Sequence, residues 1–321
     1  MPIFRSGGGK DKQGDAAARF RQESSLHSLE SGGLPLEARE RLAEQARRQG
    51  TPDQLFTSDL SINELALVRE AGYVPLGQVM GSSIYQIGWQ WMPNWNSWSG
   101  ASAELTVLTE ANYHARHLAI GRLQQEAAIL GATGVVGVRL ERKGYDWGQG
   151  LLEFIAIGTA IREEGMPHPG ESGVAPFVSD LSGQEFWMLR QAGYRPVGFA
   201  LGNCTYYQIP TWRTQNATTG GFFGGGWQNQ ELSDFTYALY DARSLAMERM
   251  ESEARAVGAE GIVGADVEIE SEPREVEVNN SKRIDMIYHF TAIGTAIAPY
   301  TGRWPVFKVE NTVPLKDKII S

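Results

Sequence analysis

The side chains that could bind a soft metal ion are few in this chain. It contains one cysteine, Cys204, and five histidines. His114 and His117 are three residues apart, with Glu110 one helical turn earlier, so the three side chains would share a helix face. They are the candidate metal ligands, but histidines on a helix surface are more often solvated than coordinated. We therefore predict no bound cofactor.

No arrangement of residues typical of catalysis is present. The sequence has no Ser/His/Asp set and no phosphate-binding P-loop motif. Asp59 and Asp180 occupy equivalent places in two similar segments and could be paired catalytic carboxylates. Each is followed by a Ser-x-x-Glu sequence, so turn formation and helix capping are the favoured roles. We predict a protein that is not an enzyme.

A glycine-rich stretch that occurs twice, at 130–137 and 257–264, is similar to a dinucleotide-binding motif. A phosphate-binding loop runs from a strand into a helix, so that the helix N-terminus faces the anion. Here the order is reversed, because a long amphipathic segment precedes the glycines and β-branched residues follow them. We predict that Gly131 and Gly258 end helices and that no nucleotide binds.

Aromatic side chains are concentrated in two equivalent loops. The candidate interaction residues in these loops are Trp89, Trp91, Trp95, Trp98, Trp212, Phe222, Phe223 and Trp227. They could fold back over their own core or lie at a subunit interface, and these two explanations are favoured equally. A lipid surface and a small-molecule pocket are further alternatives.

These features occur twice because the chain contains a tandem repeat. Phe56–Ser61 matches Phe177–Ser182 at an offset of 177 − 56 = 121 residues, and Leu130 matches Val257 at an offset of 257 − 130 = 127. The Ala156–Ile161 sequence recurs without change at an offset of 292 − 156 = 136. Each repeat is predicted to be a small α+β domain: a capped short helix, a strand, an aromatic loop, a long helix and a β-hairpin.

The predicted elements follow from caps, periodicity and turn residues. They are short helices at 61–71 and 182–192, strands at 78–87 and 199–209, long helices at 103–130 and 231–257, and hairpins at 135–143 with 152–161 and 262–271 with 284–297. The second hairpin has a charged tip, 272–283, which we expect to be mobile.

The domain boundaries follow from composition. We predict a flexible arm plus a short helix at 1–55, with the helix at 34–49, repeat 1 at 56–162, a linker at 163–176, repeat 2 at 177–298 and a tail at 299–321. The net charge of −9 argues against a nucleic-acid partner. No signal peptide or membrane span is recognisable, so we expect a cytoplasmic protein.

The order of a strand, a long helix ending in Leu-Gly-Ala-x-Gly-Val-Val-Gly, and a hairpin closing in Gly-Thr-Ala resembles the YbjQ-like family, often labelled a heavy-metal-binding domain. The resemblance implies an α+β domain that assembles into rings, commonly pentameric, with the two domains either stacked in two rings or alternating in one. It also implies metal binding. Repeat 2, however, has Asp241 and Ser244 at the places of His114 and His117.

The leading hypothesis is a non-enzymatic, ring-forming homo-oligomer that acts as a scaffold or binding protein, with the Trp-rich loops at the subunit interface or in the ring lumen. A metal-binding or metal-responsive protein and a peripheral membrane protein are the alternatives.

Overall fold

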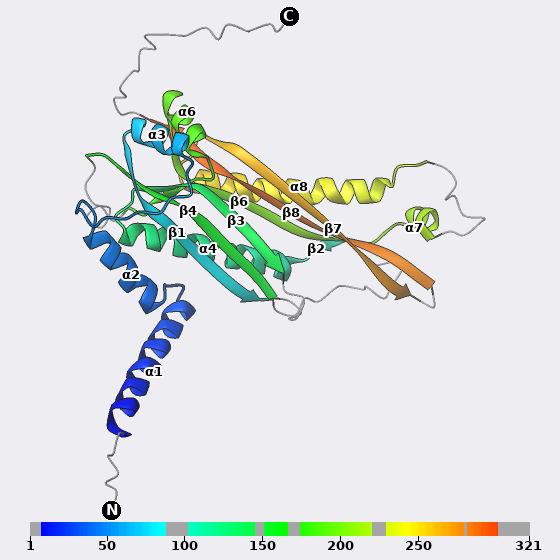
Figure 1. The fold of residues 1–321 in the computed structure, drawn as a ribbon. Coiled ribbons are helices and arrows are strands. Elements are labelled where there is room, and N and C mark those ends of the chain that lie inside the picture. Colours follow the sequence, from blue (N-terminus) through cyan, green and yellow to red (C-terminus); the bar gives the residue numbers. More distant parts are fainter. Residues whose placement is uncertain are drawn as a thin grey trace, which may run out of the picture.

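The computed structural model describes residues 8–87, 102–144, 151–165, 174–219, 229–278 and 281–300. Within these residues the chain forms two four-stranded sheets, each with a long helix packed on it (Figure 1). The helices are α1 (Gly8–Glu30), α2 (Leu36–Arg47), α3 (Ile62–Glu70), α4 (Thr106–Ile129), α6 (Gly183–Gln191), α7 (Trp212–Thr219) and α8 (Ser233–Ala256). The strands are β1 (Tyr73–Gln86), β2 (Ala103–Glu104), β3 (Gly134–Gly144), β4 (Leu151–Glu163), β5 (Phe177–Val178), β6 (Tyr194–Gln208), β7 (Gly261–Val278) and β8 (Ser281–Pro299).

Each sheet contains three antiparallel strands from one repeat and a short strand from the other. The first sheet has the order β1-β4-β3-β5, and the second has the order β2-β6-β8-β7. β5 belongs to repeat 2 but pairs in parallel with β3, whereas β2 belongs to repeat 1 but pairs with β6. The predicted α+β fold of two repeats is confirmed, and the two repeats also exchange strands.

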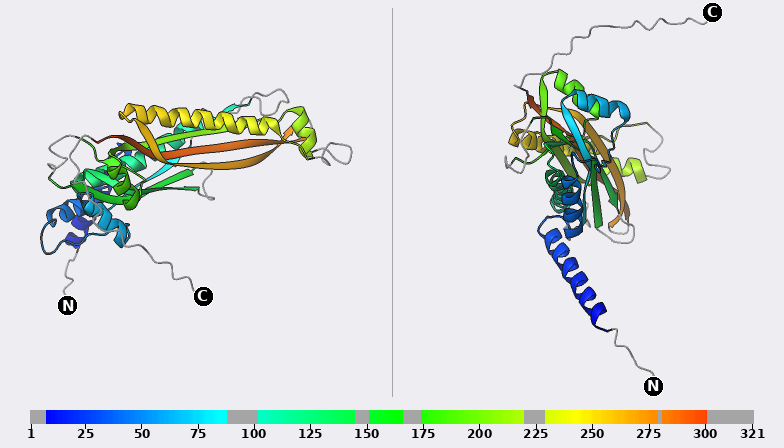
Figure 2. Two further views of the ribbon diagram at one scale, coloured as in Figure 1. Left: turned by 90° about the horizontal axis from the view of Figure 1, so that it is seen from above. Right: turned by 60° about the vertical axis from the view of Figure 1, so that its left-hand side comes forward.

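The long helices lie close to their sheets because small residues line the contact. Ala115, Ala119 and Ala127 of α4 are fully buried against the first sheet. Gly81 of β1 approaches so closely that a Cβ atom there would lie 1.9 Å from the Ala119 carbonyl oxygen. Gly202 of β6 makes the equivalent approach to α8, which Figure 2 shows along the outside of the second sheet.

The predicted helix ends are confirmed. Ser61 and Ser182 each form a complete capping box with the glutamate three residues later. Gly131 and Gly258 have φ angles of 74° and 73°, the left-handed conformation that ends a helix. The glycine-rich stretches are therefore joints between helices and strands.

The N-terminal part differs from the expected flexible arm. Gly8–Glu30 form helix α1, which projects away from the sheets in Figure 1. Alanine and charged residues with high helix propensity occupy much of this segment. Ser25 joins its end to α2 by accepting a hydrogen bond from the Leu36 amide at 3.0 Å.

The tip of the second hairpin is not the mobile loop that its charges suggested. β7 continues to Val278 and β8 begins at Ser281, so only two residues separate the strands. Helix α7 packs on this extension, and Gln215 of α7 donates to the Lys282 carbonyl oxygen at 2.6 Å. Val276 and Val278 are buried, so apolar contacts stabilise this segment as a β-ribbon.

The start of the first long helix also differs from the prediction. The helix begins at Thr106, because Ala103 and Glu104 form β2 against Tyr207 and Tyr206 of the other repeat. This pairing is between residues far apart in the sequence, and local periodicity does not reveal it.

Candidate interaction surface between the two repeats

The predicted metal ligands do not form a common site. The His114 ring stacks on Tyr85 with 6.3 Å between ring centroids, and Glu110 is exposed. The Nε2 atom of His117 lies 3.0 Å from a carboxylate oxygen of Glu253 in the other repeat. Within the described ranges, no group of three His, Cys, Asp or Glu side chains could hold a metal ion.

The predicted aromatic surface lies mainly outside the described residues. Trp212 is described: it begins α7 and is 75% exposed. The other candidates, Trp89, Trp91, Trp95, Trp98, Phe222, Phe223 and Trp227, lie outside the described ranges.

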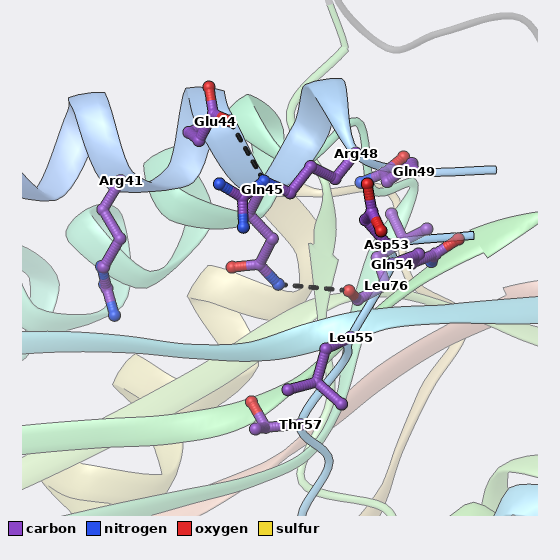
Figure 3. Close-up of a pocket in the computed structure, with 10 residues that line it drawn as sticks. All are labelled: Arg41, Glu44, Gln45, Arg48, Gln49, Asp53, Gln54, Leu55, Thr57 and Leu76. Carbon is purple, nitrogen blue, oxygen red and sulfur yellow. Dashed lines mark hydrogen bonds and ion pairs between the residues drawn. The ribbon is translucent and has the colours of Figure 1, made fainter. Parts of the chain in front are cut away.

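A hollow of about 390 Å³ lies between α2, the segment before α3 and the start of β1 (Figure 3). Several of the side chains around it have partners: Arg48 pairs with Glu44, and Gln45 donates to the Leu76 carbonyl oxygen. The exposed Leu55 forms part of its wall. The described lining offers mixed charges but no Ser, Cys, Lys or His, which does not favour a catalytic site.

The most extensive polar arrangement is the junction between the repeats. It begins with the segment Phe177–Leu181, which we call the second lead-in strand and which continues the parallel pairing of β5 along β3. The Ser179 amide donates to the Val135 carbonyl oxygen at 2.9 Å, and the Val138 amide donates to the Ser179 carbonyl oxygen at 3.0 Å. The Gly137 amide donates to the Leu181 carbonyl oxygen at 2.9 Å. Repeat 2 is therefore joined to repeat 1 by backbone hydrogen bonds.

The second lead-in strand is also fixed to its own repeat. The Ser179 hydroxyl lies 2.9 Å from the Thr295 hydroxyl, which donates to the Asp180 carboxylate. Burial raises the pKa of Asp180 above its usual value. In repeat 1, Asp59 instead pairs with Arg139 at 2.6 Å. Each aspartate thus has a structural partner within its own repeat.

Helix α4 forms the second part of the junction by bonding the backbone of β6. The Tyr113 hydroxyl donates to the Leu201 carbonyl oxygen and accepts from the Asn203 amide, both at 3.3 Å. The Thr109 hydroxyl accepts from the Thr205 amide at 3.0 Å. Burial at this contact raises the pKa of Tyr113 to about 12.

Arg116 lies at the centre of the junction and is 3% exposed. Its guanidinium lies 5.1 Å from the centroid of the Phe154 ring in the first sheet and donates to the Thr291 hydroxyl in the second at 2.8 Å. Its Nε and Nη1 atoms have no hydrogen-bond partner among the described residues. Burial lowers the pKa of Arg116 to about 10, because the charged form loses its solvation.

The long helices of the two repeats make equivalent contacts with different neighbours. Helix α8 of repeat 2 contacts repeat 1, and helix α4 of repeat 1 contacts the N-terminal segment. Arg249 pairs with Glu104 of repeat 1, whereas its equivalent, Arg122, donates to the Leu29 and Gly33 carbonyl oxygens. In the same way, Glu253 is paired with His117, and Glu126, the equivalent of Glu253, is paired with Arg41 of α2. The segment before repeat 1 therefore partly covers its free side.

The sequence alone did not identify this junction. The signal that could have found it is the recurrence of Tyr113 and Arg116 as Tyr240 and Arg243, two polar residues kept at the same places on the long helices. Their partners come from a distant segment, which the sequence does not indicate.

No helix within the described ranges is both long enough and apolar enough to cross a membrane.

Comparison with known proteins agrees with the repeated fold. Residues 73–164 and 221–299, together more than half of the chain, match the YbjQ family, described as "Putative heavy-metal-binding". A protein of Mycobacterium tuberculosis named encapsulin nanocompartment protein Rv1762c is 41% identical over 238 residues, covering 74% of this chain and 84% of that protein. A UPF0145 protein of Clostridium perfringens is 40% identical over 58 residues, covering 18% of this chain and 53% of that protein. The chain therefore belongs to the YbjQ family and carries two copies of its domain.

Proposed function

We propose that this protein is a non-enzymatic scaffold that assembles from copies of itself into a closed ring. The observation that carries the proposal is the junction inside the chain, where one side of repeat 1 is fitted to a different side of repeat 2. A contact of this head-to-tail kind generates a ring when it closes and a filament when it does not. The name of the M. tuberculosis relative, which refers to a nanocompartment, supports a role within a protein assembly.

In this arrangement the two repeats alternate around one ring. Each chain contributes the same pair of domains, so the ring holds an even number of domains. A pentamer of this chain, the oligomer that the family resemblance implies, would then be a ring of ten alternating domains, two from each of five chains. The Trp-rich loops would line the ring lumen or the contacts between chains.

The mass of the purified full chain in solution, measured by light scattering after size-exclusion chromatography, tests this proposal. We expect one species whose mass is a fixed multiple of 35.3 kDa and does not change on dilution. Replacing Trp91, Trp95 and Trp98 with Ser should weaken that species, since each buried aromatic side chain contributes on the order of a few kcal/mol. A monomer of 35.3 kDa would refute self-assembly.

The family description names heavy-metal binding, but no three possible ligands lie together among the described residues, so a metal-binding function has less support. No contact of the described residues favours a membrane-associated function. The candidate metal ligand His117 already has a partner, because its Nε2 atom lies 3.0 Å from a carboxylate oxygen of Glu253. We therefore propose no resident cofactor.

A further inference from the structure

We infer that the segment Phe56–Leu60 of one chain, the first lead-in strand, adds in parallel to the outer edge of β7 in a second copy. The inference rests on the proposed self-assembly and identifies the surfaces that would carry it. Its basis is that the chain already makes this contact once, between its own repeats.

The edge of β7 has the backbone shape of the edge that binds the second lead-in strand. β3 and β7 shift register against their partner strands at equivalent places. Gly137 and Gly264, at these shifts, have φ angles of 63° and 64°. In β3 the Gly137 amide donates to the Leu181 carbonyl oxygen. The Gly264 amide of β7 has the same backbone conformation and can donate in the same way. β7 is the last strand of its sheet, and no strand of the described chain pairs with this edge.

The first lead-in strand is held to its own repeat by the same kind of contact as the second. It lacks a neighbour among the described strands. The Ser58 hydroxyl lies 3.2 Å from Thr159, as the Ser179 hydroxyl lies near Thr295. Yet Ser179 is fully buried, whereas Ser58 is partly exposed. The neighbouring residues differ in the same direction: Val178 is 1% exposed, and its equivalent Thr57 is exposed. This segment forms no strand within the chain, and a segment left unpaired in this way is suited to pairing with the strand edge of another chain.

A second pair of surfaces agrees with the first. Tyr113 of α4 bonds the backbone of β6, where Leu201 is 1% exposed. The equivalent Tyr240 of α8 is 64% exposed, and Met80, the equivalent of Leu201 on β1, is 47% exposed. Tyr240 and Met80 are therefore both exposed in one chain, although the N-terminal segment covers the neighbouring Arg122 and Glu126 of repeat 1. Only another copy brings them together.

One position shows that the contact between chains is not identical to the contact within a chain. Gly183 at the start of α6 lies against Glu64 of α3, and a Cβ atom there would be 2.7 Å from the Glu64 Cβ atom. Its equivalent is Ile62, which is 86% exposed. The short helices must therefore lie further apart between chains, so the strand pairing carries the inference.

Disulfide formation between chains tests the register of this pairing. Val178 is opposite Val135 within the chain, and the equivalent pair between chains is Thr57 with Ile262. We expect the double variant Thr57→Cys/Ile262→Cys to form at least about fivefold more covalent oligomer under mild oxidation than Thr57→Cys/Ile269→Cys, because a disulfide requires Cα atoms within about 4.4–6.8 Å. Ile269 is a matched control, since it lies on the same strand and is 46% exposed. The native Cys204 is buried.

Substitutions on α8 provide a test that needs no cross-link. Tyr240→Ala should raise the concentration at which the assembly dissociates by about tenfold, since a tyrosine in an interface core is often a dominant contact. Tyr237→Ala should leave it unchanged, because Tyr237 is 67% exposed and corresponds to Glu110, which is also exposed.

The outcomes separate this inference from the proposed function. If the unmodified protein is monomeric by light scattering, self-assembly and this inference both fail. If the assembly is intact but the Ile262 pair forms no more cross-link than the Ile269 pair, self-assembly stands and the pairing on β7 is overturned. Equal effects of Tyr237→Ala and Tyr240→Ala would overturn the proposed contact of α8.

Discussion

At the scale of single residues, Arg116 is unusual because a charged side chain occupies the centre of an interface. It gains a ring contact and one hydrogen bond but loses its solvation, and the lowered pKa reflects this cost. Buried charges of this kind often determine which arrangement forms without adding stability. Arg116 is therefore expected to contribute to the geometry of the junction more than to its strength.

Arg116→Met should change the free energy of unfolding by no more than about 1 kcal/mol, since an apolar side chain of similar length avoids the desolvation cost. Urea denaturation measures this change, with Arg47→Met as a control at a site where the side chain is 75% exposed. A loss of more than about 3 kcal/mol would show that the charge itself holds the repeats together.

His289 makes the stability of repeat 2 dependent on pH. Burial lowers its pKa, and Arg142 lowers it further, while Glu270 and Glu272 act in the opposite direction. The folded state therefore binds this proton more weakly than the unfolded state, so stability is lost as the pH falls through about 6.5. We expect the Tm to fall between about pH 7.5 and pH 5.5, and His289→Gln to reduce that fall. An identical pH dependence in both proteins would contradict this assignment.

At the scale of elements, the position of each long helix is set by the close approach of a glycine in the adjacent strand. Gly81 meets the backbone of α4, whereas a Cβ atom added at Gly121, within α4, would meet no neighbouring atom of the described residues within 4 Å. A methyl group is therefore excluded at Gly81 but accommodated at Gly121.

Gly81→Ala should destabilise the protein by about 3 kcal/mol, because the added methyl group overlaps the Ala119 carbonyl oxygen. Gly121→Ala should stabilise it by about 0.5–1 kcal/mol, since alanine favours a helix and meets no obstruction. Thermal unfolding followed by circular dichroism distinguishes the two. Similar effects of both substitutions would mean that α4 can move away from β1.

The elements that could be predicted from the sequence are those specified by nearby residues. The capping sequences at Ser61 and Ser182 and the glycines that end α4 and α8 act within one helical turn, and the structure has them as predicted. β2 and β5 could not be predicted, because each is a two-residue strand defined by a partner in the other repeat. The extension of the β7–β8 hairpin depends likewise on α7, which packs on β8 from an earlier part of the chain.

At the scale of the whole molecule, the junction between repeats forms once within the chain. The residues equivalent to its two sides lie on the other faces of the two repeats. The completed junction buries Ser179 and Leu201, while the equivalent residues Ser58 and Met80 remain accessible. The sequence predicted the repeat, which is confirmed, and the family resemblance implied a ring, which stays a prediction. It did not predict the surfaces that we propose join the chains. Those surfaces emerge only when the environments of equivalent residues are compared in three dimensions.

The most direct test of self-assembly through matching ends is an electron micrograph of the purified full chain, averaged by class. We predict closed rings in which the two repeats alternate, because a head-to-tail contact that closes leaves no free end. Isolated particles of single-chain size, or open filaments of varying length, would contradict assembly into a closed ring.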